Sequence, residues 1–298
     1  MEARFGLRTS PSGNSDIILN FEFFILNYWK AGIVAMLCAG LFACSSTRRM
    51  HWPERNAMTA EGTGTSFYQT TAAWKWRERD SLAKAFILSG NFPSFLKKFV
   101  RINVSLTDSA SGRTISAYYF VSPDYLALGT DDDWARIPLT PMAAQVIADS
   151  FHCFLPTRKM VDDIYRQAVV KLAPVPMYAF RDSSVTMWQH HLIVEGQRKG
   201  RNGLIAGIKK DVVLSGKVTR DTKPDREAIY GWHKLDGKPI QPLYTGHINW
   251  WVDYSHGIRL VYRTIWVNGK PTDYTTVMKD PLLQKLLCDE EWCDFVRY

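Results

Sequence analysis

The residues from His247 to Gly257 concentrate the groups in this chain that could carry out chemistry. This segment of eleven residues contains His247, Asp253, Ser255 and His256, together with a tyrosine and two tryptophans. Burying so many polar and titratable groups costs free energy unless they are paired, so core packing alone rarely produces such a segment. We therefore interpret it as the working site of the protein.

One interpretation of this segment is a metal centre. His247, Asp253 and His256 would contribute to a site for zinc or a similar divalent ion, and His190 or His233 would complete it. A bound water would then be the nucleophile. Five of the seven histidines lie between residues 190 and 256, which favours their convergence. The identity of the metal stays open.

The second interpretation is nucleophilic catalysis. Ser255 would be the nucleophile or an orienting hydroxyl, a histidine would be the base, and Asp253 or Asp211 would orient that base. A third interpretation is that each histidine is a hydrogen-bonded structural residue. The sequence leaves all three open.

Basic and aromatic residues outside the segment are candidates for substrate binding. Lys209 and Lys210 precede Asp211 and could clamp an anionic group. Arg158 falls in the first turn of a predicted helix, where the helix dipole disfavours a cation, so we expect it to reach an anionic substrate or a nearby carboxylate. The predicted substrate-binding residues are Lys209, Lys210, Tyr230, Trp232, His233 and Arg158.

The amino terminus has the features of an export signal. Lys30 is followed by an apolar run over residues 31–43 and then by Cys44, which together resemble a lipoprotein signal whose cysteine is lipidated. Phe42 departs from the small residue that is usual there. The alternative is a transmembrane anchor over residues 17–43. Either interpretation tethers the protein to a membrane, and we expect it on the periplasmic or extracellular side of the cell envelope.

Composition narrows the range of partners and activities. The chain has 298 residues and a net charge of +8, which favours anionic partners such as cell-envelope polymers. Nucleic acid is not expected as a partner, because the export signal places the chain outside the cytoplasm. No GxGxxG, GxxxxGK[ST], GxSxG or HExxH pattern occurs, which argues against the common nucleotide-binding, α/β-hydrolase and zincin classes.

The cysteines allow more than one redox state. Cys288 and Cys293 lie close together near the carboxyl terminus and would form a small disulfide loop in an exported protein. They could also stay reduced, or one of them could pair with Cys153. The sequence does not choose among these possibilities.

Two short patterns resemble an uncharacterised family of exported bacterial proteins. They are Tyr-Gly-Trp-His at residues 230–233 and Asp-Tyr-Ser-His-Gly at residues 253–257, and residues 155–159 and 209–213 are also similar. The resemblance covers residues 85–285 and implies export and one continuous domain, but no activity. This chain has Ile208 where the family pattern often has histidine, so no mechanism should need a ligand there.

Periodicity predicts an α+β fold. Residues 100–107 and 114–121 alternate between apolar and polar types around a turn, which is typical of a hairpin. Helices are predicted over residues 80–90, 140–151, 157–168 and 184–198, and tight turns at Asp236-Gly237 and Asn268-Gly269. Strands and helices do not alternate as a parallel sheet requires, so we expect antiparallel hairpins packed with several helices in a single main domain.

The predicted organisation is a leader at 1–44, a flexible linker at 45–75 and the α+β domain at 76–298. We expect a membrane-tethered hydrolase that acts on a cell-envelope polymer, either peptidoglycan or polysaccharide. The alternative is a non-catalytic lipoprotein whose aromatic and basic residues bind an envelope glycan. The sequence does not decide whether the protein is an enzyme.

Overall fold

The computed structural model describes residues 47–50, 52 and 62–298, so the predicted leader and Cys44 lie outside the described residues. The helices are α2 (Gly64–Thr70), α3 (Trp76–Leu88), α4 (Pro141–Ser150), α5 (Arg158–Gln167), α6 (Ser184–Arg198) and α7 (Tyr274–Lys279), with short 3-10 helices η1 (Ser94–Lys97) and η2 (Leu283–Leu286). In the described part of the chain, no helix combines the length and the apolar character needed to cross a bilayer.

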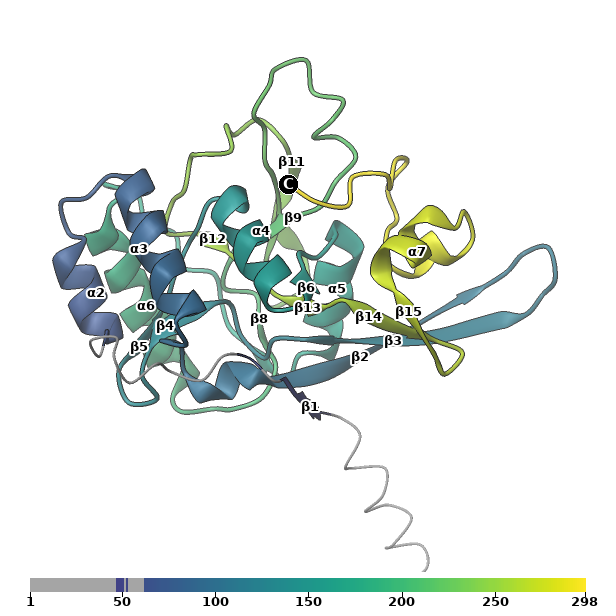
Figure 1. The fold of residues 1–298 in the computed structure, drawn as a ribbon, viewed down its shortest axis with the longest axis horizontal. Coiled ribbons are helices and arrows are strands. Elements are labelled where there is room, and N and C mark those ends of the chain that lie inside the picture. Colours follow the sequence, from purple (N-terminus) through teal and green to yellow (C-terminus); the bar gives the residue numbers. More distant parts are fainter. Residues whose placement is uncertain (1–46, 51, 53–61) are drawn as a thin grey trace, which may run out of the picture. The chain divides into compact units, whose positions relative to one another are not determined.

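The larger sheet has seven strands among the described residues. They are β1 (Thr47–Arg49), β2 (Lys98–Thr107), β3 (Thr114–Val121), β6 (Cys153–Phe154), β13 (Val261–Tyr262), β14 (Thr264–Val267) and β15 (Lys270–Asp273). The strand order is β1-β2-β3-β13-β6, and β14 pairs with both β3 and β15. Figure 1 shows the β2–β3 hairpin extending away from the helices α2, α3 and α6, which lie together.

The predicted hairpins are present. The register of β2 and β3 ends at the pair Thr107–Thr114, and Ile102 and Val104 of β2 face the core while their neighbours are more exposed. Asn268 and Gly269 have φ values of 48° and 80°, as a type I′ turn between β14 and β15 requires. The α+β class with a single domain is therefore confirmed.

A smaller sheet carries the candidate site. Its strands are β9 (Lys210–Val213), β10 (Ala228–His233), β11 (Pro239–Tyr244) and β12 (His256–Gly257), in the order β11-β10-β9-β12. Strand β12 runs parallel to β9, whereas the other pairs are antiparallel. Two further strand pairs are β4 (Ala127–Gly129) with β5 (Trp134–Arg136), and β7 (Val170–Lys171) with β8 (Ile205–Ala206).

Two predictions near the amino terminus differ from the structure. Asp80 does not begin a helix, because α3 already begins at Trp76; instead its Oδ2 accepts hydrogen bonds from the backbone nitrogen and the hydroxyl of Thr140, at 2.9 and 2.7 Å. The predicted linker contains β1, which pairs with β2, and α2, which buries Phe67 and Tyr68 in the core. Aromatic burial overrides the polar composition of that segment.

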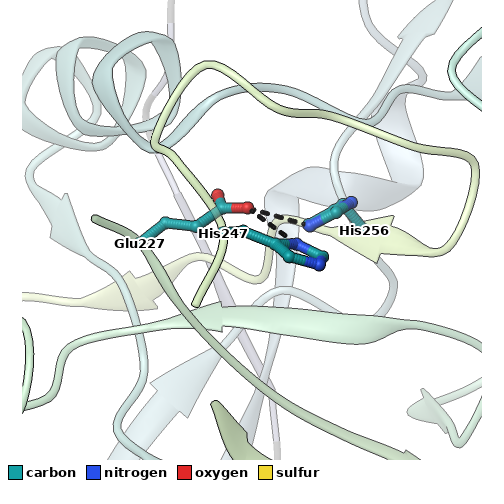
Figure 2. A group of neighbouring side chains, drawn as sticks. All are labelled: Glu227, His247 and His256. Carbon is teal, nitrogen blue, oxygen red and sulfur yellow. Dashed lines mark hydrogen bonds and ion pairs between the residues drawn. The ribbon is translucent and has the colours of Figure 1, made fainter. Parts of the chain in front are cut away.

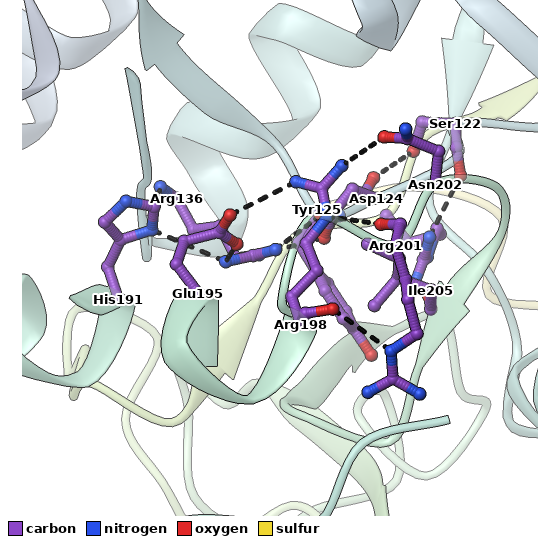
Figure 3. A network of polar contacts seen from close by, with 11 residues as sticks. Ser122, Asp124, Tyr125, Arg136, His191, Glu195, Arg198, Arg201, Asn202 and Ile205 are labelled. Atoms are coloured by element: carbon purple, nitrogen blue, oxygen red, sulfur yellow. Dashed lines mark hydrogen bonds and ion pairs between the residues drawn. The ribbon is translucent and has the colours of Figure 1, made fainter. Parts of the chain in front are cut away.

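A buried ionic network joins the β4–β5 hairpin to α6 (Figure 3). The guanidinium of Arg136 makes two hydrogen bonds to Asp124, at 2.6 and 2.9 Å, and a third contact of 2.8 Å to Glu195. Arg136 and Asp124 are each only 1% exposed. His191 lies against this network, and burial together with the Arg136 charge lowers the pKa of His191 to about 3, so it is a neutral structural residue.

We predict that Arg136→Met lowers the free energy of unfolding by about 3–5 kcal/mol, because it leaves the Asp124 carboxylate buried without its partner. Urea denaturation followed by circular dichroism measures the change. Arg297→Met is the control, since Arg297 pairs with Asp149 on the surface and should contribute less than about 1 kcal/mol. Equal losses in the two variants would contradict the prediction.

Candidate functional site

Three segments meet at the carboxylate of Glu227, which immediately precedes β10. The backbone nitrogen of Glu227 donates to the carbonyl of His247, at 3.2 Å, and the adjacent residues Arg226 and Ile248 form an antiparallel bridge. His256 opens β12, where it pairs with Lys210 of β9. Backbone pairing therefore fixes the positions from which Glu227, His247 and His256 project.

The three side chains form a compact cluster of metal-ligating atoms. Figure 2 shows the Oε1 atom of Glu227 facing both imidazoles, 3.1 Å from Nε2 of His256 and 3.5 Å from Nδ1 of His247. The three ligand atoms lie within 4.8 Å of one another. Glu227 and His256 are completely buried, whereas the His247 side chain is 25% exposed.

Asp253 supports His256 from the side opposite Glu227. Its Oδ1 lies 3.2 Å from Nδ1 of His256, and its backbone nitrogen lies 3.0 Å from the same atom. Asp253 is itself held by the Ser255 hydroxyl, which donates to Oδ1 at 2.5 Å, and by Arg181, whose Nη2 lies 2.6 Å from Oδ2. This carboxylate therefore orients the imidazole as an outer-sphere partner would.

The two carboxylates also determine the charge of His256. Burial alone lowers the pKa of His256, but the negative charge of Glu227 and the hydrogen bonds to Asp253 and Glu227 raise it to about 9. Burial opposes ionisation of Asp253, yet its hydrogen bonds with His256 and Ser255 hold its pKa well below the usual range. Both its raised pKa and its complete burial argue against His256 as a general base.

The arrangement does not favour Ser255 as a nucleophile. Its hydroxyl donates to Asp253 rather than to an imidazole, and the residue is completely buried. A serine nucleophile needs a base within hydrogen-bond reach and access to substrate. Ser255 instead positions Asp253, and the metal interpretation fits the geometry better.

Two atoms of the cluster lack the partners that buried polar atoms require. Oε2 of Glu227 and Nδ1 of His247 are buried and make no hydrogen bond within the described structure. Leaving such atoms unpaired costs about 1–3 kcal/mol each. A divalent cation between the three residues would bind Nδ1 of His247 and Oε1 of Glu227, the carboxylate oxygen that faces both imidazoles. Two imidazoles and one carboxylate are the ligands of many catalytic zinc sites, and the 3.1 and 3.5 Å spacings suit ligands about 2.0–2.2 Å from one ion.

A pocket of about 330 Å³ lies beside the cluster, and His247 is the residue of the cluster that lines it. Arg181, Arg226 and Trp251 line this pocket together with His247, and Nε of Arg226 makes no hydrogen bond in the described structure. The pocket therefore suits a substrate that carries negative charge.

Lys210 and Trp232 lie on the cluster side of β9 and β10. Nζ of Lys210 lies 5.2 Å from the centroid of the Trp232 ring, and burial lowers the pKa of this lysine against the opposing charges of Asp253 and Glu227. Trp232 has a φ of 57°, which is unusual for a bulky residue and marks a locally strained backbone. These two predicted substrate-binding residues therefore border the site.

Other predicted residues lie away from the cluster. Lys209 points to the opposite side of β9 from Lys210, where it donates to the carbonyl of Tyr254 and its Nζ lies 3.3 Å from Nδ1 of His190. Burial and the Lys209 charge lower the pKa of His190 to about 2, and His190 is not among the clustered ligand atoms. The prediction that His190 completes the metal site is not supported.

His233 and Tyr230 form a separate group with Asp162 of α5. Nε2 of His233 lies 2.8 Å from Asp162, and the Tyr230 hydroxyl donates to the same carboxylate at 3.0 Å. Arg158 pairs with Asp289, at 2.9 Å. Of the two predicted partners, an anionic substrate or a nearby carboxylate, the structure shows the carboxylate. These three residues do not contribute to the Glu227 cluster.

Asp211 is also separate from the cluster. Its Oδ2 accepts a hydrogen bond from the hydroxyl of Tyr125, at 2.9 Å, and the charge of Arg259 acts on it from nearby. Asp211 is a residue of β9 that is only 2% exposed, and it orients no histidine of the cluster. The predicted catalytic role for Asp211 therefore has no support in this geometry.

Sequence reasoning missed Glu227, Arg181 and Arg226. Arg226 and Glu227 are consecutive and have no histidine or aromatic residue next to them, and Arg181 stands between Phe180 and Asp182. The one available signal for Glu227 was its position directly before an apolar strand, where a carboxylate at a strand end commonly faces a site. Arg181 lies in the irregular segment before α6 and carried no signal.

The cysteine alternatives are resolved. Cys288 and Cys293 form a disulfide with a Cα–Cα distance of 6.1 Å, and Cys153 is a buried free thiol. Burial raises the pKa of Cys153 well above its usual value, so this thiol is unreactive in the folded protein.

No protein-family model, curated protein or solved structure matches this chain. The resemblance to exported bacterial proteins therefore stays a prediction, and the geometry of the site is the basis for a functional proposal.

We predict that Asp211 makes the stability of the protein depend on pH. Burial raises its pKa from 3.8 to about 6, against the effects of Arg259 and Tyr125, so the folded state binds a proton more tightly than the unfolded state. The stabilisation is complete below pH 4 and is lost as the pH rises through 6, a change of about 2–3 kcal/mol.

Urea denaturation of the wild type and of Asp211→Asn at several pH values tests this prediction. The difference in the free energy of unfolding between the two proteins should change between pH 4 and 6 and stay constant above pH 7. A difference that does not vary with pH would contradict it.

Proposed function

We propose that the protein is a divalent-metal-dependent hydrolase that works outside the cytoplasm on an anionic cell-envelope polymer. The observation that carries this proposal is the cluster of Glu227, His247 and His256, in which the buried Nδ1 of His247 makes no hydrogen bond within the described structure. Zinc is the ion that best suits two imidazoles and one carboxylate.

Each residue of the site has a distinct role in this proposal. Glu227, His247 and His256 would hold the ion, which would supply a Lewis acid and lower the pKa of a coordinated water. Asp253 orients His256 and keeps it in place. Arg181 and Arg226 would bind negative charge on the substrate in the pocket beside His247.

Two features support a location outside the cytoplasm. The disulfide between Cys288 and Cys293 is of the kind that persists in oxidising compartments. The apolar run that ends at Cys44 has the pattern of a lipoprotein signal, which would tether the protein to a membrane. The net charge of +8 suits an anionic polymer as partner.

The rival proposal is a non-catalytic lipoprotein that binds an envelope glycan. Exposed tryptophans near the pocket favour it, because Trp250 is 42% exposed and Trp251 lines the pocket wall. The two proposals differ in whether a metal at the cluster is needed for turnover, so metal binding and hydrolysis must be measured separately.

We predict that the protein, stripped of metal and then titrated with zinc, binds one ion per chain. Isothermal titration calorimetry and elemental analysis after dialysis measure the stoichiometry. Glu227→Gln and His247→Ala should abolish tight binding, because each removes a ligand. His247 is half-buried, so His247→Ala should leave the fold intact, as circular dichroism would verify.

His233→Ala is the matched control for these variants. His233 is also a buried histidine paired with a carboxylate, but it lies outside the cluster. It should leave the zinc stoichiometry at one. Zinc binding that survives in Glu227→Gln and His247→Ala, or no zinc binding by the wild type, would refute the metal centre.

A second pair of variants separates the metal mechanism from serine catalysis. Asp253→Asn should weaken zinc binding by about 10–100-fold, because it weakens the group that orients His256. Ser255→Ala should retain hydrolysis of peptidoglycan or anionic polysaccharide within about tenfold, since its hydroxyl only supports Asp253. Complete loss of hydrolysis in Ser255→Ala with unchanged zinc affinity would instead favour a serine nucleophile.

A further inference from the structure

A second hollow, of about 260 Å³, lies next to the pocket at His247 and is walled by tryptophans. The residues that matter in it are Trp74, Trp76, Trp250 and Trp251 on the walls, with Arg79 also lining it. We propose that this hollow is a subsite for a saccharide that carries carboxylate groups. The inference names the substrate class of the proposed hydrolase and rests on that function, although saccharide binding itself needs no metal.

Two of the tryptophan rings at the hollow are stacked on each other. The rings of Trp76 and Trp250 are nearly parallel, with an interplanar angle of 14° and a centroid separation of 6.2 Å. Trp74 and Trp250 are 40% and 42% exposed. Large aromatic rings gathered in one exposed place are typical of a binding surface. The C–H faces of sugar rings pack on the electron-rich faces of indoles, so these rings suit a saccharide.

Arg79 gives the hollow an unsatisfied hydrogen-bond donor. Its side chain is 1% exposed, and one nitrogen, Nη1, donates to the carbonyl of Asp182 at 2.8 Å. The other two guanidinium nitrogens, Nε and Nη2, have no hydrogen-bond partner in the described structure. A small shift of the Trp76 and Trp250 rings around a bound ligand would let this arginine donate to a carboxylate or hydroxyl.

The hollow lies beside the pocket of the candidate metal centre. Trp251 lines both, and the consecutive residues Arg181 and Asp182 line one each. Arg226, on the metal side, donates from Nη1 to the carbonyl of Gly246, and its Nε lies 4.0 Å from Asp221. The shared wall at Trp251 would let one polymer chain contact both the tryptophans and His247.

Charge along this path favours an anionic sugar over a neutral one. The two hollows together are lined by Lys75, Arg79, Arg181 and Arg226, whereas Asp182 is their one acidic lining residue. Nε and Nη2 of Arg79 are unsatisfied, and this edge of a guanidinium matches the planar, bidentate geometry of carboxylates. A uronic acid or another sugar acid would place its ring on the tryptophans and its carboxylate near the cations.

The hollow at His233 carries no comparable inference. Its volume is larger, about 420 Å³, but Asp162, Tyr230 and His233 satisfy one another there. The surface between the β2–β3 hairpin and α5 is likewise occupied by pairs such as Lys159 with Asp163. Unsatisfied donors beside exposed aromatic rings distinguish the tryptophan hollow.

The test is the binding of hexagalacturonate, with one carboxylate per ring, to the full chain in the presence of a chelator. Tryptophan fluorescence and calorimetry measure the affinity, and neutral cellohexaose is the comparison ligand. Trp250→Ala and Trp76→Ala should weaken hexagalacturonate binding by about tenfold or more. Trp292→Ala is the matched control, because Trp292 is 38% exposed and stacks with Arg220 but lines neither hollow.

Absence of hexagalacturonate binding, equal losses in Trp250→Ala and Trp292→Ala, or tighter binding of cellohexaose would overturn the subsite. The chelator separates this result from the metal proposal. Saccharide binding without zinc binding or hydrolysis would support the subsite and refute the hydrolase. Zinc-dependent hydrolysis that Trp250→Ala leaves unchanged would support the hydrolase and refute the subsite.

Discussion

The carboxylate of Glu227 is completely buried, and an ionised carboxylate in that environment must have compensating charge or hydrogen bonds. Two imidazoles approach one of its oxygens, while the other oxygen is left without a partner. A protonated His256 compensates the charge in part. A divalent ion between Glu227, His247 and His256 would compensate the negative charge of Glu227 fully. The surrounding residues are arranged around this buried charge.

The small sheet fixes the positions of the residues in this cluster. Strand β9 is flanked by β10 and β12, so the segment after Glu227 and the segment that begins at His256 are fixed relative to each other by backbone hydrogen bonds. The bridge between Arg226 and Ile248 then fixes the loop that carries His247. Catalytic groups held on strands and bridges are positioned more accurately than groups on free loops. The tryptophans Trp250 and Trp251 follow on the same loop, which joins the candidate metal centre to the proposed saccharide subsite.

Local patterns predicted the fold well and the site in part. Alternation predicted the β2–β3 hairpin, and capping residues such as Thr140 and Thr157 predicted α4 and α5, because these signals act over a few residues. The density of polar groups pointed to His247, Asp253 and His256. It could not reveal Glu227, whose role depends on long-range pairing, nor show that His190 and Asp211 face Lys209 and Tyr125 instead. Asp211 lies on strand β9 and His190 on helix α6, and tertiary contacts set the strand register and the helix orientation that decide which way each faces.

The position of a metal ion is the most direct test of this account. Crystals grown with zinc, measured on both sides of the zinc absorption edge, would show where the ion lies. The account predicts one strong anomalous peak about 2.0–2.2 Å from ligand atoms of Glu227, His247 and His256. A map without a peak there, in which His256 still donates to Glu227, would contradict it.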